Sequence, residues 1–182
     1  VREGLLIPSG VSGVYGRGGV FEDVLQRFDQ FVTRVGGADG ATVMRFPTLL
    51  PRAHFERSGY MKSFPQLAGI VTSFAGDEHA HMDLLRVLDR GDDWSASLSP
   101  TDVVLTPAAC YPVYPTLTGQ TVPAAGKLVD VLTVCFRHEP SDDPARMQMF
   151  RQREYVRIGD PAAVRAHRDL WLERGQQMLR DV

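Results

Sequence analysis

The sequence predicts a mixed α+β fold in which a mostly antiparallel sheet is flanked by helices. Two strand-like runs, 128–136 and 149–158, border a polar segment, which predicts two antiparallel strands joined by a long ordered loop. A stripe of apolar residues at helical spacing over 20–35 is followed by a short apolar run, 41–46, that Pro47 closes. Strands and helices therefore do not alternate regularly, as they would in a parallel α/β fold.

The N-terminal half begins with a glycine-rich stretch, 4–19, which we interpret as a turn-rich lead-in. It lacks the Lys-Ser/Thr ending of a phosphate-binding P-loop. The helix over 20–35 is expected to stop at Gly36 and Gly37. Its apolar stripe comprises Val20, Val24, Phe28, Phe31 and Val35, widened by Phe21, Leu25 and Val32.

The remaining elements follow from local patterns. The expected series is a short helix at 52–59, a loop at 60–65, a strand at 68–74, a helix from 77 or 78 to 90, a strand at 102–106, a Pro/Gly-rich connector to 126, and a helix from 161 to about 180 that Asp160 caps. His79 and His81 lie two positions apart, so on a helix they point in different directions. We expect exposed histidines there and no metal pair.

Composition restricts the classes of function. With 182 residues, 43% of them hydrophobic and 23% charged, the chain suits one globular domain. The formal charge of −2 argues weakly against a polynucleotide partner. No apolar run reaches the length of a membrane span and no signal-peptide layout is present, so we expect a cytoplasmic protein.

Two cysteines, Cys110 and Cys135, are too few for a disulfide framework and are expected to be free thiols.

Charged residues crowd the predicted strand pair and its loop. A planar guanidinium holds phosphate oxygens in pairs, and an aromatic ring offers a stacking surface to a base, so this hairpin is suited to ATP. A solvated sheet face with surface ion pairs is the alternative interpretation. The residues concerned are Arg137, Glu139, Arg146, Phe150, Arg151, Arg153 and Glu154.

The hairpin resembles motif 2 of the class II aminoacyl-tRNA synthetases. The resemblance assigns Arg137 to the α-phosphate and the substrate carboxylate, Arg146 to the distal phosphates, Glu139 to the adenine amino group and Phe150 to the adenine face. The helix and strand over 20–47 resemble motif 1, which forms the dimer interface in that family, although an ordinary core helix and strand would show the same periodicity. The six matching residues of the hairpin are Phe136, Arg137, Glu139, Arg146, Phe150 and Glu154.

Segments along nearly the whole chain resemble one group, the amino acid:[carrier protein] ligases, which are seryl-tRNA synthetase homologues without a tRNA-binding arm. These segments read GVYGRGGVFEDV, RFPTLLPR, FERSGYMKSFP, DVVLTPAACYPVYP and the hairpin itself. The resemblance implies ATP-dependent activation of a small amino acid, glycine, alanine or serine, and its transfer to the phosphopantetheine thiol of a carrier protein. It also implies Mg²⁺ with ATP, a homodimer, and neither tRNA nor a membrane as partner.

The same resemblance implies a zinc site. The ligases bind Zn²⁺ through Cys, Glu and Cys, where it takes the substrate amino group, and Cys110 and Glu154 match the first two ligands. Cys135 does not match the third, which in the family lies beyond residue 182. Without the resemblance, Cys110 in its proline-stiffened segment would be interpreted as a buried structural cysteine.

Motif 3, a Gly-rich strand and helix whose Arg holds the γ-phosphate, is not recognisable between Gly159 and Val182. We therefore expect residues 1–182 to be one class II synthetase-like catalytic domain truncated at its C-terminus. Alone, this segment is expected to be inactive and prone to aggregate. Two alternatives stay open: a tRNA synthetase proper, disfavoured because no helical tRNA-binding arm is recognisable, and a non-catalytic paralogue acting as a binding module.

Overall fold

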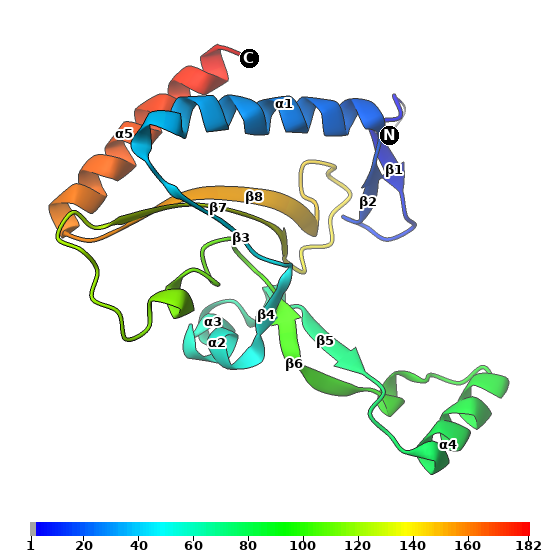
Figure 1. Cartoon of the computed structure of the whole chain (residues 1–182). Coiled ribbons are helices and arrows are strands. Elements are labelled where there is room, and N and C mark those ends of the chain that lie inside the picture. The colour runs from blue at the N-terminus through cyan, green and yellow to red at the C-terminus, as the bar shows by residue number, and fades with distance from the viewer. Residues whose placement is uncertain (1–2) are drawn as a thin grey trace.

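The computed structural model describes residues 3–182 and contains, within them, three small sheets. The central sheet has the order β3-β7-β8 and carries the predicted hairpin (Figure 1). A second three-stranded sheet, β4-β6-β5, continues from it, and β1 and β2 form a two-stranded hairpin at the N-terminus. No helix in this described part of the chain has the length and apolar character needed to cross a bilayer.

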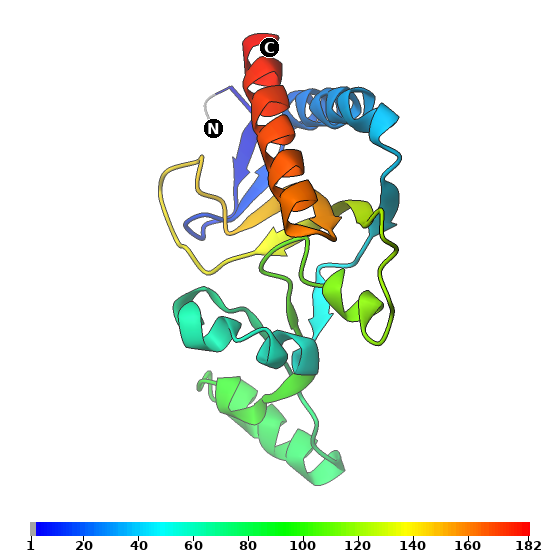
Figure 2. The same cartoon turned by 90° about the vertical axis from the view of Figure 1, so that its left-hand side faces the viewer.

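The central hairpin confirms the sequence prediction closely. Strands β7 (Lys127–Phe136) and β8 (Met149–Ile158) pair antiparallel along their whole lengths. Strand β3 (Thr42–Arg45) joins β7 in parallel, so the sheets are mostly but not wholly antiparallel. Helices α1 (Gly19–Gly36) and α5 (Pro161–Arg180) cover one face of this sheet (Figure 2).

Alternation along β7 and β8 gives the central sheet two different faces. On one face, Val129, Val131 and Cys135 are fully buried and pack against Ala109 and Val113 of the segment that follows β6. On the opposite face, polar and aromatic side chains meet the helices, among them Arg151 and Arg153, which bond to Asp29 of α1, and Tyr155, which stacks on Trp171 of α5.

Helix α1 lies close to the sheet at its C-terminal end. A Cβ atom at Gly36 would lie 2.3 Å from the hydroxyl oxygen of Tyr155, so only glycine allows this approach. The helix ends at Gly36, as predicted, and the left-handed residue comes later, at Gly40 (φ 66°). Only part of the predicted apolar stripe is covered: Val20 and Val24 are 68% and 61% exposed, whereas Phe31 and Val35 are half-buried.

The second sheet has its own small core. It consists of β4 (Leu49–Pro51), β6 (Ser99–Leu105) and β5 (Ile70–Ser73), with α2 (Arg52–Arg57) and α3 (Tyr60–Ser63) beside it. The predicted loop at 60–65 is wrong, because these residues form α3 and the start of a 3-10 turn, Pro65–Leu67. Tyr60 is buried with its ring 5.2 Å from that of Phe55, and this tertiary contact outweighs the turn-like sequence.

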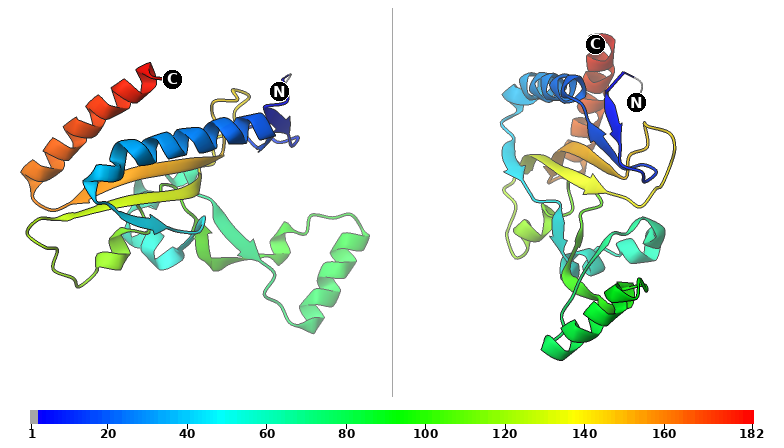
Figure 3. Two further views of the ribbon diagram at one scale, coloured as in Figure 1. Left: turned by 45° about the horizontal axis from the view of Figure 1, so that its top comes forward. Right: turned by 90° about the vertical axis from the view of Figure 1, so that its right-hand side faces the viewer.

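Helix α4 (Glu78–Asp89) stands out from the body between β5 and β6 (Figure 3). Its bounds agree closely with the predicted helix from 77 or 78 to 90; Asp77 caps it through a bond from the Ala80 amide, and Gly91 follows it with a φ of 71°. His79 and His81 are exposed, which confirms that prediction too.

The N-terminal stretch is more regular than predicted. Besides the predicted turns, it contains strands β1 (Leu6–Pro8) and β2 (Tyr15–Arg17), paired antiparallel. Each strand is only three residues long, which is too short for a recognisable alternation of polar and apolar residues.

Candidate active site

The end of the central hairpin brings Arg137 and Phe150 together. The Arg137 guanidinium lies over the Phe150 ring, 5.3 Å from its centroid, and its Nε donates to the carbonyl oxygen of Pro107 at 3.0 Å. Its two Nη groups have no hydrogen-bond partner among residues 3–182. A fixed guanidinium with free donors is suited to a phosphate or carboxylate.

The loop between the strands carries Glu139 and Arg146. A bond from the Arg137 amide to the Gln148 carbonyl oxygen, 2.9 Å, closes the loop at its base. Glu139 is half-buried there, whereas Arg146 is exposed. Within the described residues no hydrogen bond or ion pair joins the Arg146 side chain to Arg137 or Glu139, so the structure brings only part of the predicted set into contact.

Cys110 and Glu154, which are far apart in sequence, meet in the structure. The Cys110 amide donates to Oε1 of Glu154 at 3.1 Å, and the neighbouring Ala109 amide donates to Oε1 of Gln152 at 3.2 Å. Glu154 and Gln152 share one face of β8, because they are two positions apart. Sequence reasoning missed Gln152, although its spacing from Glu154 was the available signal.

Burial controls the chemistry of the Cys110 thiol. Burial, together with the nearby negative charge of Glu154, raises the pKa of Cys110 to about 11. The free thiol is therefore protonated at neutral pH, and a bound cation would be needed to hold it as a thiolate. Tyr114 lies beside it, and burial raises the pKa of that phenol to about 12.

Cys135 is separate from this pair. Its side chain is fully buried and its Sγ donates to Oε1 of Gln152 at 3.3 Å. Both cysteines are free thiols, as predicted. Among residues 3–182 no group of three His, Cys, Asp or Glu side chains could hold a metal ion. Cys110 and Glu154 by themselves offer two side chains of the kinds that bind zinc.

A cavity of about 570 Å³ opens next to Cys110. This volume lies within the usual range for small-molecule sites. Its walls come from α2 and from the segment after β6, and sequence reasoning missed the α2 contribution. The lining residues include His54, Arg57, Ser58, Cys110, Tyr111 and Tyr114.

Comparison with known proteins identifies relatives over the whole chain. It is 45% identical over 183 residues to amino acid–[acyl-carrier-protein] ligase 2 of Bradyrhizobium diazoefficiens, covering 100% of this chain and 54% of the relative. It is 44% identical over 174 residues to ligase 1 of the same organism, covering 95% and 53%. The chain thus spans about half the length of the curated relatives it matches. No protein-family model matches the chain.

Two solved structures share the fold. M. kandleri SerRS, in complex with A. aeolicus tRNASec, superposes with a TM-score of 0.83 at 20% identity, covering 98% of this chain and 37% of that one. Giardia lamblia prolyl-tRNA synthetase with prolyl-adenylate gives a TM-score of 0.65 at 14% identity, with 92% and 31% covered. The chain therefore has the α+β fold of a class II aminoacyl-tRNA synthetase catalytic core, which confirms the predicted fold class.

Proposed function

We propose, from the homology of this chain to the amino acid–[acyl-carrier-protein] ligases, that the complete protein activates a small amino acid with ATP and transfers it to a carrier protein. In the first step a carboxylate oxygen of the amino acid attacks the α-phosphorus of ATP, and pyrophosphate leaves. In the second step the phosphopantetheine thiol of the carrier attacks the acyl carbon, and AMP leaves while the thiol proton is lost.

The observation that carries this proposal is the fixed Arg137 guanidinium. The Nε bond to Pro107 and the position over Phe150 preorganise the guanidinium. Its Nη donors, which have no partner among residues 3–182, would bind oxygens of the α-phosphate and the carboxylate. Such a group offsets the negative charge that builds up at the phosphorus. We assign Phe150 to the adenine face, Glu139 to the adenine amino group and Arg146 to the distal phosphates, with Mg²⁺ accompanying ATP.

We assign the cavity beside Cys110 to the amino-acid substrate. Cys110 and Glu154 fit a zinc site because the Cys110 amide bonds to the Glu154 carboxylate and the charge of that carboxylate acts on the thiol, with a third ligand supplied from outside the described residues. When bound, Zn²⁺ would supply a Lewis acid for the lone pair of the substrate amino group. Around it, Tyr111 and Tyr114 would limit the room for a side chain, which favours glycine, alanine or serine.

We also assign the exposed stripe of α1 to a homodimer interface. Val20, Val24 and Phe28 follow one another at helical spacing along α1 and are 68%, 61% and 36% exposed. An apolar strip of this kind on a long helix is suited to burial against a second subunit.

A transfer assay tests the function. The complete protein is incubated with ATP, labelled amino acid and either a phosphopantetheinylated carrier protein or bulk tRNA. We expect label on the carrier only, bound as a thioester that hydroxylamine releases, and none on a carrier without phosphopantetheine. Label on tRNA would instead identify a tRNA synthetase.

A further inference from the structure

The N-terminal β1–β2 hairpin contacts the loop that carries Glu139 and Arg146. The turn of this hairpin accepts two hydrogen bonds from Gln148: the Gln148 amide donates to the Gly13 carbonyl oxygen at 2.7 Å, and Gln148 Nε2 donates to that of Ser12 at 2.8 Å. Farther along the loop, Ser12 Oγ donates to Oδ1 of Asp142 at 2.9 Å. Gln148 is only 4% exposed, so its two hydrogen bonds to the turn are shielded from water and hold the turn against the loop.

Gly13 allows the two segments to approach closely. It is buried and has a φ of +77°. A Cβ atom there would lie 3.0 Å from Cγ of Gln148 and 3.4 Å from the carbonyl oxygens of Arg146 and Glu139. The backbone of both predicted nucleotide-binding residues therefore packs directly on this glycine, and a side chain would displace the loop.

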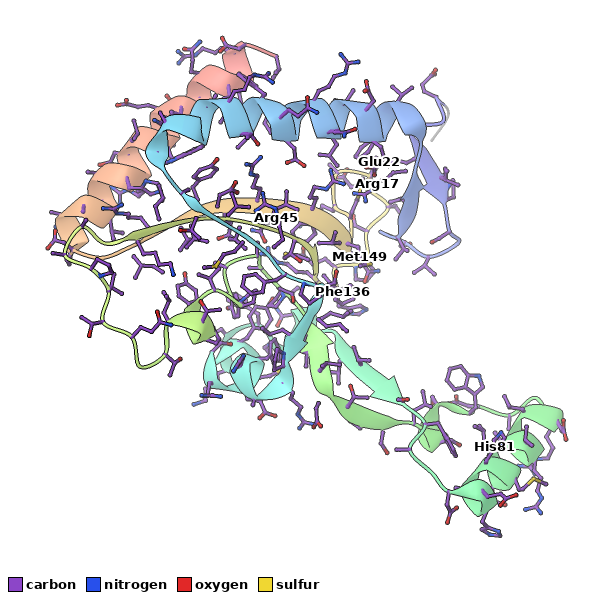
Figure 4. The ribbon with its side chains drawn as sticks, viewed as in Figure 1. Arg17, Glu22, Arg45, His81, Phe136 and Met149 are labelled. Carbon is purple, nitrogen blue, oxygen red and sulfur yellow. The ribbon has the colours of Figure 1, made fainter. Side chains whose placement is uncertain are left out.

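The hairpin is itself fixed to the central sheet. Arg17 at the end of β2 pairs with Glu22 of α1 at 2.6 Å, and Glu22 pairs with Arg151 of β8 at 3.4 Å. Figure 4 shows Arg17 and Glu22 side by side where the hairpin meets α1, near the end of the central strands marked by Met149. The hairpin thus connects a rigid strand with the loop that leads into that same strand.

We propose that the β1–β2 hairpin is a positioning element for nucleotide binding, acting through the contact of Gly13 with Gln148, Glu139 and Arg146. The inference rests on the proposed ATP site. A loop held in its binding conformation does not have to be ordered when ATP arrives, so the entropy cost of binding is smaller. Gly13 and Gln148 would touch no substrate and would act only by placing Glu139 and Arg146.

Two glycines of the same hairpin provide a matched test in the complete protein. Gly13→Ala adds a methyl group against the loop, whereas Gly10→Ala adds one at a similar φ of +87° with nothing within 4 Å. Both variants bear the backbone strain of the left-handed region, but only one disturbs the contact. In amino-acid-dependent pyrophosphate exchange we expect Gly13→Ala to raise KM for ATP at least about tenfold, with KM for the amino acid unchanged. Gly10→Ala should leave both constants near the wild-type values.

A second measurement separates this inference from the proposed function. Hydrogen exchange of the amides in loop 138–147, measured without substrates, should be faster in Gly13→Ala than in Gly10→Ala. Gln148→Met removes the side-chain amide and so its Nε2 bond to Ser12, but keeps the backbone bond to Gly13. It should raise both the hydrogen exchange of the loop amides and KM for ATP, by smaller factors than Gly13→Ala does. If the wild-type protein shows no pyrophosphate exchange, the proposed function fails. Hydrogen exchange of the loop amides then still decides whether the hairpin positions the loop. The inference would be overturned if the loop amides exchanged hydrogen equally fast in Gly13→Ala and Gly10→Ala, or if the two variants changed KM for ATP equally.

Discussion

The carboxylate oxygen Oε1 of Glu154 lies 3.1 Å from the backbone nitrogen of Cys110, although the two residues are 44 positions apart in the chain. Glu154 belongs to the long strand β8, and Cys110 to a proline-rich turn whose neighbours Ala109 and Val113 are fully buried. Both partners are therefore held by surrounding structure. A rigid pairing of a thiol-bearing turn with a carboxylate is what a metal site with a defined geometry requires.

Removal of either of these two residues should abolish zinc binding. We expect one zinc per subunit in the complete protein, lost in Cys110→Ser and in Glu154→Ala, because each change removes one donor from the site. Metal analysis of the purified, folded variants measures this.

Cys135→Ser is the matched control for the zinc prediction. Cys135 is a buried thiol that donates to Gln152, so its replacement should leave the zinc content unchanged. Equal zinc in all three variants would show that Cys110 is an ordinary buried cysteine.

Replacement of Arg137 should remove most of the adenylation activity. Arg137→Ala deletes a preorganised donor at the reacting phosphate, and losses of this kind cost at least about 2.7 kcal/mol, or about a hundredfold in rate. Amino-acid-dependent pyrophosphate exchange by the complete protein reports this step directly. Arg165→Ala, which changes an exposed arginine of α5, should keep full activity. An Arg137→Ala enzyme of near wild-type activity would refute the role of Arg137.

A charge in the apolar stripe of α1 should separate the proposed dimer. Val24→Glu places a carboxylate in the middle of the strip formed by Val20, Val24 and Phe28, where burial against a partner would desolvate it. We expect the apparent mass in sedimentation to fall by half. Gln30→Glu, at an exposed position off the stripe, should leave the mass unchanged. A dimer that survives Val24→Glu would place the interface elsewhere.

Local patterns predicted the regular elements well. The bounds of β8, Met149–Ile158, agree with the predicted run, and α5 begins where Asp160 and Pro161 predicted it, with Asp160 accepting bonds from the Ala162 and Ala163 amides. These signals are confined to a few neighbouring residues. Helix α3 was missed because its stability depends on the burial of Tyr60 against Phe55, which no local pattern contains.

Local sequence patterns predicted only part of the candidate site. Arg137 directly follows β7 and Phe150 lies near the start of β8, at the same end of the hairpin, so strand pairing brings them together. The pairing of Cys110 with Glu154 depends on how the turn after β6 packs on the sheet, and only the resemblance to a family pointed to it. The contact of Gly13 with Gln148 was not predicted at all, because a glycine in a turn gives no indication of what packs against it.

Asp130 should stabilise the protein in a pH-dependent way. Its carboxylate accepts two bonds from Arg153, at 2.9 and 2.7 Å, and both side chains are less than a tenth exposed. Burial alone would raise the pKa of Asp130, but the bonds and charge of Arg153, together with Arg45, outweigh it and hold the pKa below its usual value. A lowered folded-state pKa means that the stabilisation is complete above the unfolded-state pKa, near 4, and is lost as pH falls through the folded-state value.

We therefore expect Asp130→Asn to lower the stability of the complete protein at pH 7 by about 3 kcal/mol, since it leaves the buried Arg153 without its counter-charge. The difference from wild type should begin to narrow below about pH 4, because the unfolded wild-type chain then binds a proton at Asp130, and it should narrow further as pH falls through the lower folded-state pKa of that carboxyl. Asp169→Asn is the control: Asp169 pairs with Arg168 at the surface, where both side chains are more than half exposed, so the change should cost less than about 1 kcal/mol. Thermal unfolding followed from pH 3 to pH 7 measures both. A difference for Asp130→Asn that stays constant over this range would mean that its effect comes from packing and not from the charge of the carboxylate.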